Sequence, residues 1–372
     1  MAVNRDTLWR RLRPYAAVDL PLLLCIVLLL ATGLVTVYSA AADFPGRFAA
    51  QLRNIGIALA LLWVAANVPP RLLMRHAAAL YGIGVLMLLA VLVVGVSKKG
   101  ATRWLSVGFD FQPSEIMKIA MPLMLAWFFH FYGAARRWQT FAVAAALLAL
   151  PVGLIMKQPD LGTALLVLAA GGYVIVLAGL SWRALLALAV AGIAAVPLSW
   201  PLLHDYQRHR VLTLLNPDAD PLGKGFQIKQ AGIAIGADGM SGRGWMEGTQ
   251  GHLGFLPERS TDFIFSVYAE EFGLAGNIVL LLLYFFLIVR GLQITARAAT
   301  PFSRLLAGAI TMILFTYAFI NIGIVSGIFP VVGVPLPFIS YGGTALMTLG
   351  LGCGILMSVQ RESQALARGW LG

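Results

Sequence analysis

Ten long apolar segments are the feature of this sequence that most restricts its fold. A helix needs about 20 predominantly apolar residues to cross the hydrocarbon core of a bilayer. Hydrophobic residues make up 59% of the chain and charged residues only 12%, which is more apolar surface than a soluble fold can bury. We therefore predict an all-α polytopic membrane protein with about ten transmembrane helices. The expected helices span residues 17–39, 48–67, 74–96, 114–132, 139–156, 161–179, 182–202, 264–290, 303–329 and 336–360.

The charged residues predict which ends of these helices face the cytoplasm. The net charge is +11, but the basic residues lie between apolar segments and do not cluster on one polar face, as they do in nucleic-acid-binding proteins. With the N-terminus inside, the cytoplasmic segments carry 14 basic and three acidic residues, whereas the outer segments carry 13 of each. This asymmetry follows the positive-inside rule. We expect both termini in the cytoplasm and no nucleic-acid partner.

One connection, residues 203–263, is much longer than the others and lies on the predicted outer side. Loops beyond about 15 residues are usually functional or disordered. Apolar residues such as Phe226, Ile228 and Trp245 alternate with polar ones here, which favours a folded loop with short interfacial helices. We expect a single membrane domain, residues 1–372, with this outer loop inserted between the seventh and eighth helices.

Polar residues that open apolar segments are candidates for a site, because a charged group inside a membrane costs about 2.5–3.5 kcal/mol on insertion scales. Glu115 and Lys118, at the start of the fourth segment, are three residues apart, so they share a helix face and can pair. The pair is either a structural ion pair or the charged wall of a substrate cavity. Asp160 opens the sixth segment, where it can cap the helix or face the same cavity.

The last apolar segment opens with two prolines and a pair of glycines between Pro335 and Gly343. These residues should break the helix near the outer side. Broken backbone at membrane depth is tolerated only where it is buried or lines a cavity. We expect either a kink with no further role or a cavity lining that includes Ser340 and Tyr341.

The densest polar stretch runs from Leu256 to Phe265, where the outer loop meets the eighth helix. Asp262 can cap that helix, or it can be a partly desolvated carboxylate that acts as a general base. Glu258 lies in the same stretch. Basic residues of the outer loop, including Arg210 and Lys229, can hold a phosphate or pyrophosphate, although solvated loop charge is the simpler interpretation for most of them.

Several other chemistries are excluded because their motifs are missing. The chain has no GxxxxGK[ST] phosphate loop, no GxSxG nucleophile motif and no HExxH zinc motif. Its two cysteines and five histidines have no metal-ligand spacing. We expect no metal site built by the protein alone, whereas a divalent cation such as Mg²⁺ or Mn²⁺ bound with a pyrophosphate remains open.

Six stretches together resemble the SEDS family of bacterial cell-wall polymerases, and the resemblance covers nearly the whole chain. Residues 252–259 and 332–337 look like the family member that serves cell elongation rather than the one that serves division. The six stretches are Gly100–Leu105, Gln112–Lys118, Gln158–Gly162, Arg210–Gly225, Phe255–Phe265 with Ala269–Glu271, and Leu336–Gly343.

The resemblance implies a multi-pass protein of the bacterial plasma membrane that polymerises lipid II, a disaccharide-pentapeptide carried on undecaprenyl pyrophosphate. It implies Asp262 as the catalytic residue, and as partner a class B penicillin-binding protein, a transpeptidase of the elongation machinery. Because the lipid pyrophosphate is already a good leaving group, one base on the acceptor hydroxyl suffices, together with cations on the pyrophosphate. The expected substrate-binding residues are Arg103, Glu115, Lys118, Asp160, Arg210, Lys229, Glu258, Ser340 and Tyr341.

Two other functions remain open. A lipid II flippase would also have ten helices, a broken helix and intramembrane charges, but this chain shows no internal repeat and its polar residues gather at the outer face. The chain could also be a membrane scaffold that only recruits the transpeptidase. A scaffold would not need Glu115, Lys118 and Asp262 to lie close together.

Overall fold

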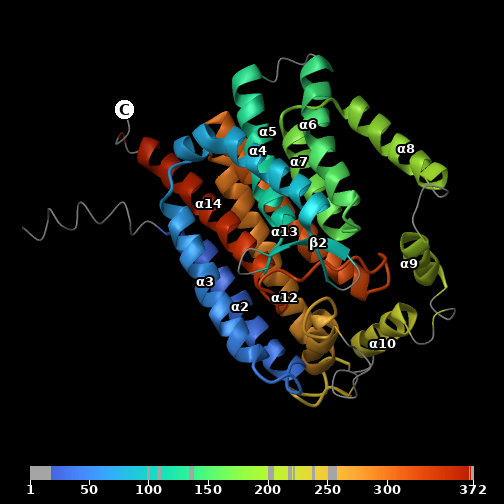
Figure 1. The fold of residues 1–372 in the computed structure, drawn as a ribbon. Coiled ribbons are helices and arrows are strands. Elements are labelled where there is room, and N and C mark those ends of the chain that lie inside the picture. The colour runs from blue at the N-terminus through green and yellow to red at the C-terminus, as the bar shows by residue number, and fades with distance from the viewer. Residues whose placement is uncertain are drawn as a thin grey trace, which may run out of the picture.

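The computed structural model describes residues 18–98, 101–106, 110–133, 138–199, 205–216, 220, 223–236, 239–249, 258–367 and 369. These residues form a bundle of helices (Figure 1), and each of the ten predicted segments overlaps one observed helix. The ten are α2 (Leu20–Ala40), α3 (Arg47–Asn67), α4 (Pro70–Val94), α5 (Pro113–Tyr132), α6 (Trp138–Met156), α7 (Leu161–Leu177), α8 (Trp182–Ser199), α12 (Ile264–Ala296), α13 (Pro301–Val325) and α14 (Thr344–Ala367).

Six of the described helices, namely α2, α3, α4, α6, α12 and α13, are long and apolar enough to cross a membrane. The mostly helical architecture is therefore confirmed. The number of helices that cross the membrane and their orientation stay predictions.

Local sequence explains where several of these helices begin. Asp19 caps α2, with its carboxylate accepting a hydrogen bond from the Leu22 N–H at 3.0 Å. Thr300 caps α13 by accepting from the Ser303 N–H at 3.0 Å. Proline occupies the first turn of α2, α4, α5 and α13, where its missing N–H leaves no helical hydrogen bond unmade.

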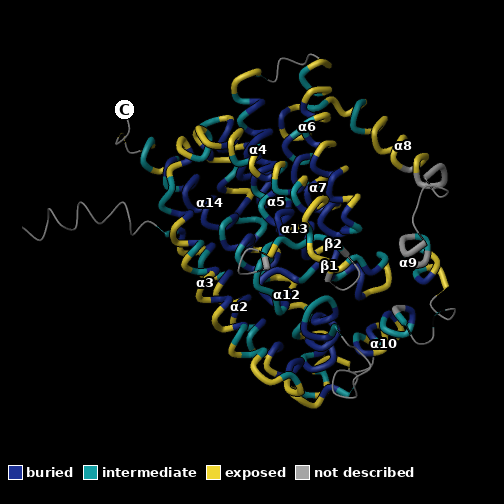
Figure 2. Tube along the Cα trace, viewed as in Figure 1, coloured by how far each residue is buried: buried dark blue, intermediate teal, exposed yellow. Residues whose placement is uncertain are grey.

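Helix α13 lies at the centre of the bundle. It packs against α5, α7, α12 and α14. Of its most apolar stretch of 18 residues, 78% is buried, whereas the corresponding share is 22–39% in α2, α3, α4, α6 and α12. Figure 2 shows the buried residues concentrated along the inner faces of the bundle. Apart from the exposed Arg304, the polar side chains on α13 therefore face other protein segments.

Helix α8 differs from the rest because it stands beside the bundle (Figure 1) and most of its residues are exposed (Figure 2). Trp182 and Leu188, for example, are 76% and 61% exposed. Side chains of this composition are stable against lipid, as the membrane interpretation requires. The outer loop that follows α8 contains two further described helices, α9 (Asp205–Leu215) and α10 (Lys224–Gly236), and α10 packs against α12 and α13.

A small antiparallel sheet between α4 and α5 was not predicted. Its strands are β1 (Val96–Lys98), β2 (Ala101–Ser106) and β3 (Asp110–Phe111), in the order β1-β2-β3. Val96 pairs with Trp104, and Leu105 pairs with Phe111. The central strand β2 packs against α4 and α5, which brings Arg103 to the start of α5.

The backbone is irregular at two places near the predicted outer side. The predicted break at the start of the last segment is present: α14 begins only at Thr344, eight residues after the predicted start at 336. Helix α12 also has a break, at Gly273, whose φ and ψ are 61° and −158°. Residues 239–244 of the outer loop pack there, with the Arg243 N–H donating to the Glu270 carbonyl at 3.0 Å.

Candidate functional site

The segment from Glu258 to Phe263, which leads into α12, is held by the non-helical residues before α14. The Tyr341 N–H donates to the Ser260 carbonyl at 2.8 Å. The Ser340 hydroxyl donates to the Thr261 carbonyl at 2.7 Å and accepts from the Leu336 N–H at 2.7 Å. Because Ser340 is only 4% exposed, its role in this structure is to join the two segments.

Asp262 is partly exposed and fixed through its backbone. Its carbonyl accepts from Asn321 Nδ2 at 2.9 Å, and the same nitrogen donates to the Val334 carbonyl at 2.7 Å. The N-cap residue of α12 is Phe263, which makes no side-chain capping hydrogen bond. Asp262 is therefore not the N-cap residue of α12.

Gly333 and Gly162 allow α7 and Asp262 to approach the same stretch of backbone. A Cβ atom at Gly333 would lie 3.6 Å from Asp262 Oδ2, and the φ of Gly333 is 76°, a conformation that glycine adopts without strain. A Cβ atom at Gly162 would lie 2.5 Å from the Val332 carbonyl oxygen. Residues 332–333 therefore separate the Asp262 carboxylate from the start of α7.

Asp160, at the start of α7, takes the capping role considered for it. Its carboxylate caps the helix, accepting from the Thr163 N–H at 3.1 Å and from the Thr163 hydroxyl at 2.9 Å. It also accepts from Gln112 Nε2 at 2.7 Å, and Arg103 Nη1 lies 3.5 Å away. The Arg103 side chain is 29% exposed, so this cluster reaches the protein surface.

Glu115 and Lys118 of α5 form a buried ion pair with each other. Side chains of two more helices, α13 and α14, bond to this pair. Lys118 Nζ lies 2.6 Å from Glu115 Oε1 and donates to the Tyr317 hydroxyl at 2.6 Å. The Thr348 hydroxyl is 3.1 Å from the other Glu115 oxygen. The two charged residues are 7% and 3% exposed, so their pairing joins α5, α13 and α14.

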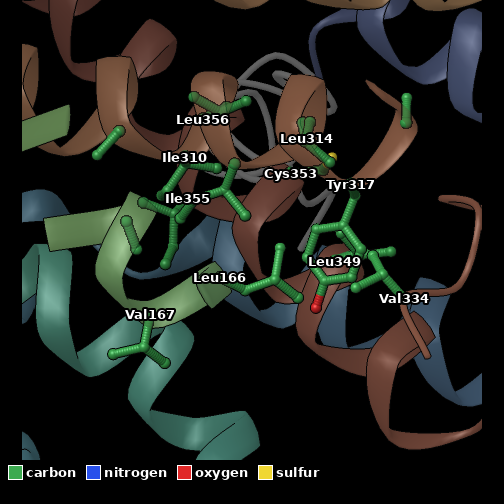
Figure 3. Packing of buried hydrophobic residues seen from close by; sticks show 14 of the residues in the cluster. Leu166, Val167, Ile310, Leu314, Tyr317, Val334, Leu349, Cys353, Ile355 and Leu356 are labelled. Atoms are coloured by element: carbon green, nitrogen blue, oxygen red, sulfur yellow. The ribbon is translucent and has the colours of Figure 1, made fainter. Parts of the chain in front are cut away.

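The space beside this pair is small. A cavity of about 20 Å³ is lined by Lys118, Tyr317, Thr348 and aliphatic residues, which is room for about one water molecule. Figure 3 shows the Tyr317 ring among Leu314, Leu349 and Val334, with its hydroxyl group directed away from the labelled aliphatic cluster around Leu356. A sugar cannot enter this cavity as the structure stands.

Residues 20–365 match the family of FtsW, RodA and SpoVE, described as cell cycle proteins. The chain belongs to this family. It is the SEDS family that the sequence stretches resembled.

Related sequences extend over almost the whole chain. The MrdB protein of Escherichia coli K12, named a peptidoglycan glycosyltransferase, is 47% identical over 98% of both chains. A probable peptidoglycan glycosyltransferase FtsW of Geobacter metallireducens is 37% identical over 92% of this chain and 94% of its own. The match to an MrdB protein agrees with the predicted likeness to the elongation member.

Solved structures also match this SEDS chain. RodA of Thermus thermophilus, a rod shape determining protein, superposes with a TM-score of 0.71 at 32% identity and covers 93% of this chain and 98% of its own. A chain from a peptidoglycan synthase complex, described as coordinating polymerisation and crosslinking, superposes with a TM-score of 0.82 at 35% identity and covers 94% and 99%. With its apolar helices, the chain is thus a multi-pass protein of the inner membrane.

Eight of the ten predicted site residues of this SEDS chain fall into three groups. Glu258, Asp262, Ser340 and Tyr341 lie together; Glu258 accepts from the Thr261 hydroxyl at 3.0 Å, and Tyr341 is partly exposed. Arg103 and Asp160 form the second group, and Glu115 and Lys118 the third. Arg210 on α9 is partly buried and Lys229 on α10 is exposed. Their predicted roles in binding substrate stay predictions.

Three polar residues of the site were missed by the sequence reasoning. Asn321 is fully buried in α13, Gln51 Nε2 donates to the Ser340 carbonyl at 3.2 Å, and Arg47 Nη1 donates to Ser260 Oγ at 2.7 Å. Asn321 and Gln51 are polar residues within apolar segments, so the criterion applied to Glu115 and Lys118 would have found them.

The described residues contain no group of three or more histidine, cysteine, aspartate or glutamate side chains positioned to hold a metal ion. Two arginines are suited to binding an anion, because both are partly exposed. Arg47 lies beside the segment that contains Asp262, and Arg103 lies beside Asp160.

Proposed function

We propose that this chain is a peptidoglycan glycosyltransferase in which Asp262 is the general base. The activity is that of its named relatives, of which the E. coli MrdB protein is 47% identical over 98% of both chains. The single observation that carries the assignment to Asp262 is its setting. Its backbone is fixed by Asn321, its side chain is partly exposed, and the N-cap position of α12 belongs to another residue.

The proposed substrate is lipid II. The acceptor's sugar 4-hydroxyl transfers its proton to Asp262 as its oxygen attacks the anomeric carbon of the donor. The bond from that carbon to the lipid pyrophosphate breaks, and the pyrophosphate leaves with the electron pair. Attack opposite the leaving group inverts an α-linked donor to a β-linked glycan. General-base assistance contributes about 10²–10⁴-fold.

This chemistry needs one carboxylate at the reacting hydroxyl, unlike a glycosidase, which uses two carboxylates on either side of one bond. Asp160 does not supply a second one, because Thr163, Gln112 and Arg103 already surround its oxygens. Arg103 remains a candidate cation for the substrate. A divalent ion bound with the pyrophosphate would be revealed by loss of activity in the presence of a chelator and its return on adding Mg²⁺ or Mn²⁺.

A lipid II assay in detergent tests the activity itself. Purified protein is given lipid II where no membrane separates two compartments, and glycan chains are resolved by gel electrophoresis. Chain formation is expected from a polymerase. A flippase or a scaffold forms no chains under these conditions, so their absence would contradict the proposal.

The proposed partner is a class B penicillin-binding protein, bound through its transmembrane helix and its outer region. The support is the similarity to a chain from a peptidoglycan synthase complex. We expect the two proteins to co-purify and the complex to polymerise faster than the lone chain. Equal rates without co-purification would contradict this partner.

A further inference from the structure

Two arginines lie over the same aromatic ring at the predicted outer ends of α2 and α3. The guanidinium carbon of Arg47 is 3.9 Å from the centre of the Phe44 ring, and that of Arg259 is 5.4 Å from it. The two side chains nevertheless have different surroundings, which indicate different roles.

Arg259 has the surroundings of a structural residue. Only 4% of it is exposed, its Nε donates to the Ala40 carbonyl at 2.7 Å, and its Nη2 pairs with the Asp43 carboxylate. Its charge is thus compensated by a carboxylate, and its contacts tie the Glu258–Phe263 segment to the end of α2.

Arg47 has no such compensation. It is partly exposed, and among the described residues its side chain makes one hydrogen bond, at 2.7 Å, to the neutral Ser260 hydroxyl. It takes part in none of the ion pairs formed among the described residues. The Tyr341 ring centre lies 5.5 Å from its guanidinium carbon. Phe44 and Tyr341 thus hold a guanidinium group most of whose five donors bond to no other described residue.

The backbone adds to the positive charge at this point. Arg47 is the first residue of α3, a helix of 21 residues whose N-cap, Gly46, provides no side-chain capping group. The N-terminus of a helix carries a partial positive charge and favours anions, so a cation is unfavourable there unless an anion joins it. An arginine at this position, with no carboxylate partner among the described residues, is therefore suited to binding an anion.

The ligand would lie beside the proposed catalytic residue. Ser260, which accepts the Arg47 hydrogen bond, precedes Asp262 by two residues, and two residues span at most about 7 Å. A guanidinium plane matches phosphate oxygens in a bidentate geometry. Resting on the function proposed above, we propose that Arg47 binds the pyrophosphate of the lipid-linked donor and stabilises the charge it gains when the bond to the sugar breaks.

Binding of a prenyl diphosphate tests this role without requiring catalysis. The experiment uses the full chain with Asp262→Asn in detergent, with farnesyl diphosphate as probe and farnesol as the uncharged control. Arg47→Gln should weaken farnesyl diphosphate binding about tenfold or more, which is the effect of losing a charged hydrogen-bond partner. Arg47→Lys keeps the charge without the planar fork, so its loss should be smaller. Farnesol binding should not change.

Arg53→Gln is the matched control, because Arg53 lies on the same helix, is exposed, and loses the same charge. Equal weakening by Arg47→Gln and Arg53→Gln would reduce the effect to general electrostatics and overturn the proposal. So would a parent protein that binds farnesyl diphosphate no better than farnesol. Ser260→Ala removes the hydrogen bond but keeps the guanidinium group. If it weakens farnesyl diphosphate binding as much as Arg47→Gln does, the role of Arg47 is to hold Ser260 in place, and the proposal is overturned.

A soluble muramoyl-pentapeptide distinguishes the other anion of lipid II, the carboxylates of its peptide. If Arg47→Gln weakens binding of this peptide and leaves farnesyl diphosphate binding intact, the pyrophosphate assignment is wrong. Because every arm already carries Asp262→Asn, these results do not depend on whether Asp262 is the base. Failure of this inference is thereby separate from failure of the proposed function.

Discussion

The charged groups at Glu115–Lys118 and at Asp262 lie in two settings within one apolar chain. The Glu115–Lys118 pair is almost fully buried, and Tyr317 and Thr348 complete its hydrogen bonds. Asp262 is partly exposed, and the protein fixes its backbone carbonyl through Asn321. The buried pair is suited to joining helices, whereas the exposed carboxylate on a fixed backbone is suited to meeting a substrate hydroxyl. Five experiments test this contrast.

The largest effect expected is all or none, and it concerns which side of the membrane Asp262 faces. Met240 is 68% exposed and belongs to the loop segment that packs against α12 near Gly273. A cysteine at Met240, in a chain whose own two cysteines are replaced, should react with an impermeant reagent in intact cells. Reaction only after permeabilisation would reverse the predicted topology and place the Asp262 site inside.

Breaking the buried pair should have the largest effect on stability. Glu115→Ala or Lys118→Ala leaves one charge buried without its partner, which costs about 3–5 kcal/mol. Both variants should melt at lower temperature in detergent and lose activity. Exchanging the two charged residues should not restore stability and activity, because Tyr317 is positioned to bond a lysine at 118 and Thr348 to bond a glutamate at 115.

A double replacement by apolar residues, Glu115→Leu with Lys118→Met, sharpens this test. Removing both charges of a buried pair is often far less destabilising than removing one. We expect the double variant to melt above either single variant. Wild-type melting and activity in both single variants would show that the pair contributes no more than a surface ion pair, about 0–1 kcal/mol.

Asn321→Leu should have an intermediate effect, concentrated on activity. It removes the donor shared by the Asp262 and Val334 carbonyls, and a buried polar group left unpaired costs about 1–3 kcal/mol. Thr316→Val is the control on the same helix, since the Thr316 hydroxyl bonds Tyr173 and the Met312 carbonyl instead. A rate of glycan formation reduced equally in the two variants would contradict a specific role in placing Asp262.

Gly333→Ala should have the smallest effect. The φ of 76° at Gly333 costs an alanine about 1–2 kcal/mol, but its Cβ would make only ordinary contact, 3.6 Å from Asp262 Oδ2. Gly162→Ala should be worse, because its Cβ would lie 2.5 Å from a backbone oxygen. Melting temperatures that rank the two variants in the opposite order would contradict the packing of residues 332–333 between α7 and Asp262.

The helices could be predicted from the sequence because long apolar segments have few alternatives to a membrane helix. The break before α14 followed from Pro335, Pro337 and the adjacent glycines, and the cap at Asp160 followed from a residue type that commonly begins helices. The break in α12 at Gly273 could not be predicted, because a single glycine inside a helix is tolerated. It is the packing of Gly242 against it that requires glycine: a Cβ at Gly273 would lie 2.2 Å from the Gly242 nitrogen.

Only those contacts of the site that join residues close together in the sequence could be predicted. Glu115 and Lys118 are neighbours on one helix turn, so their pairing could be predicted. Tyr317 and Thr348, which also bond to the pair, lie about 200 positions further along the chain, and their contacts could not be predicted. The strands between α4 and α5 were missed since they are short, and β3 has only two residues. Arg47 was missed because an arginine at the end of an apolar segment also fits ordinary charge at the membrane surface.

The most direct test of the central claim is the initial rate of glycan formation from lipid II by Asp262→Asn in detergent. Asparagine keeps the shape and the capping ability of aspartate but cannot accept the proton, so the rate should fall about 10²–10⁴-fold, as it should for Asp262→Ala. Asp262→Glu should also be slow, because misplacing a catalytic group by about 1 Å can cost on the order of a hundredfold. Glu247→Gln, which changes an exposed carboxylate on the same predicted outer side, should cost less than about tenfold, and melting temperature and partner binding should be normal in the Asp262 variants. An Asp262→Asn protein that forms glycan at the wild-type rate would contradict the assignment of Asp262 as the base.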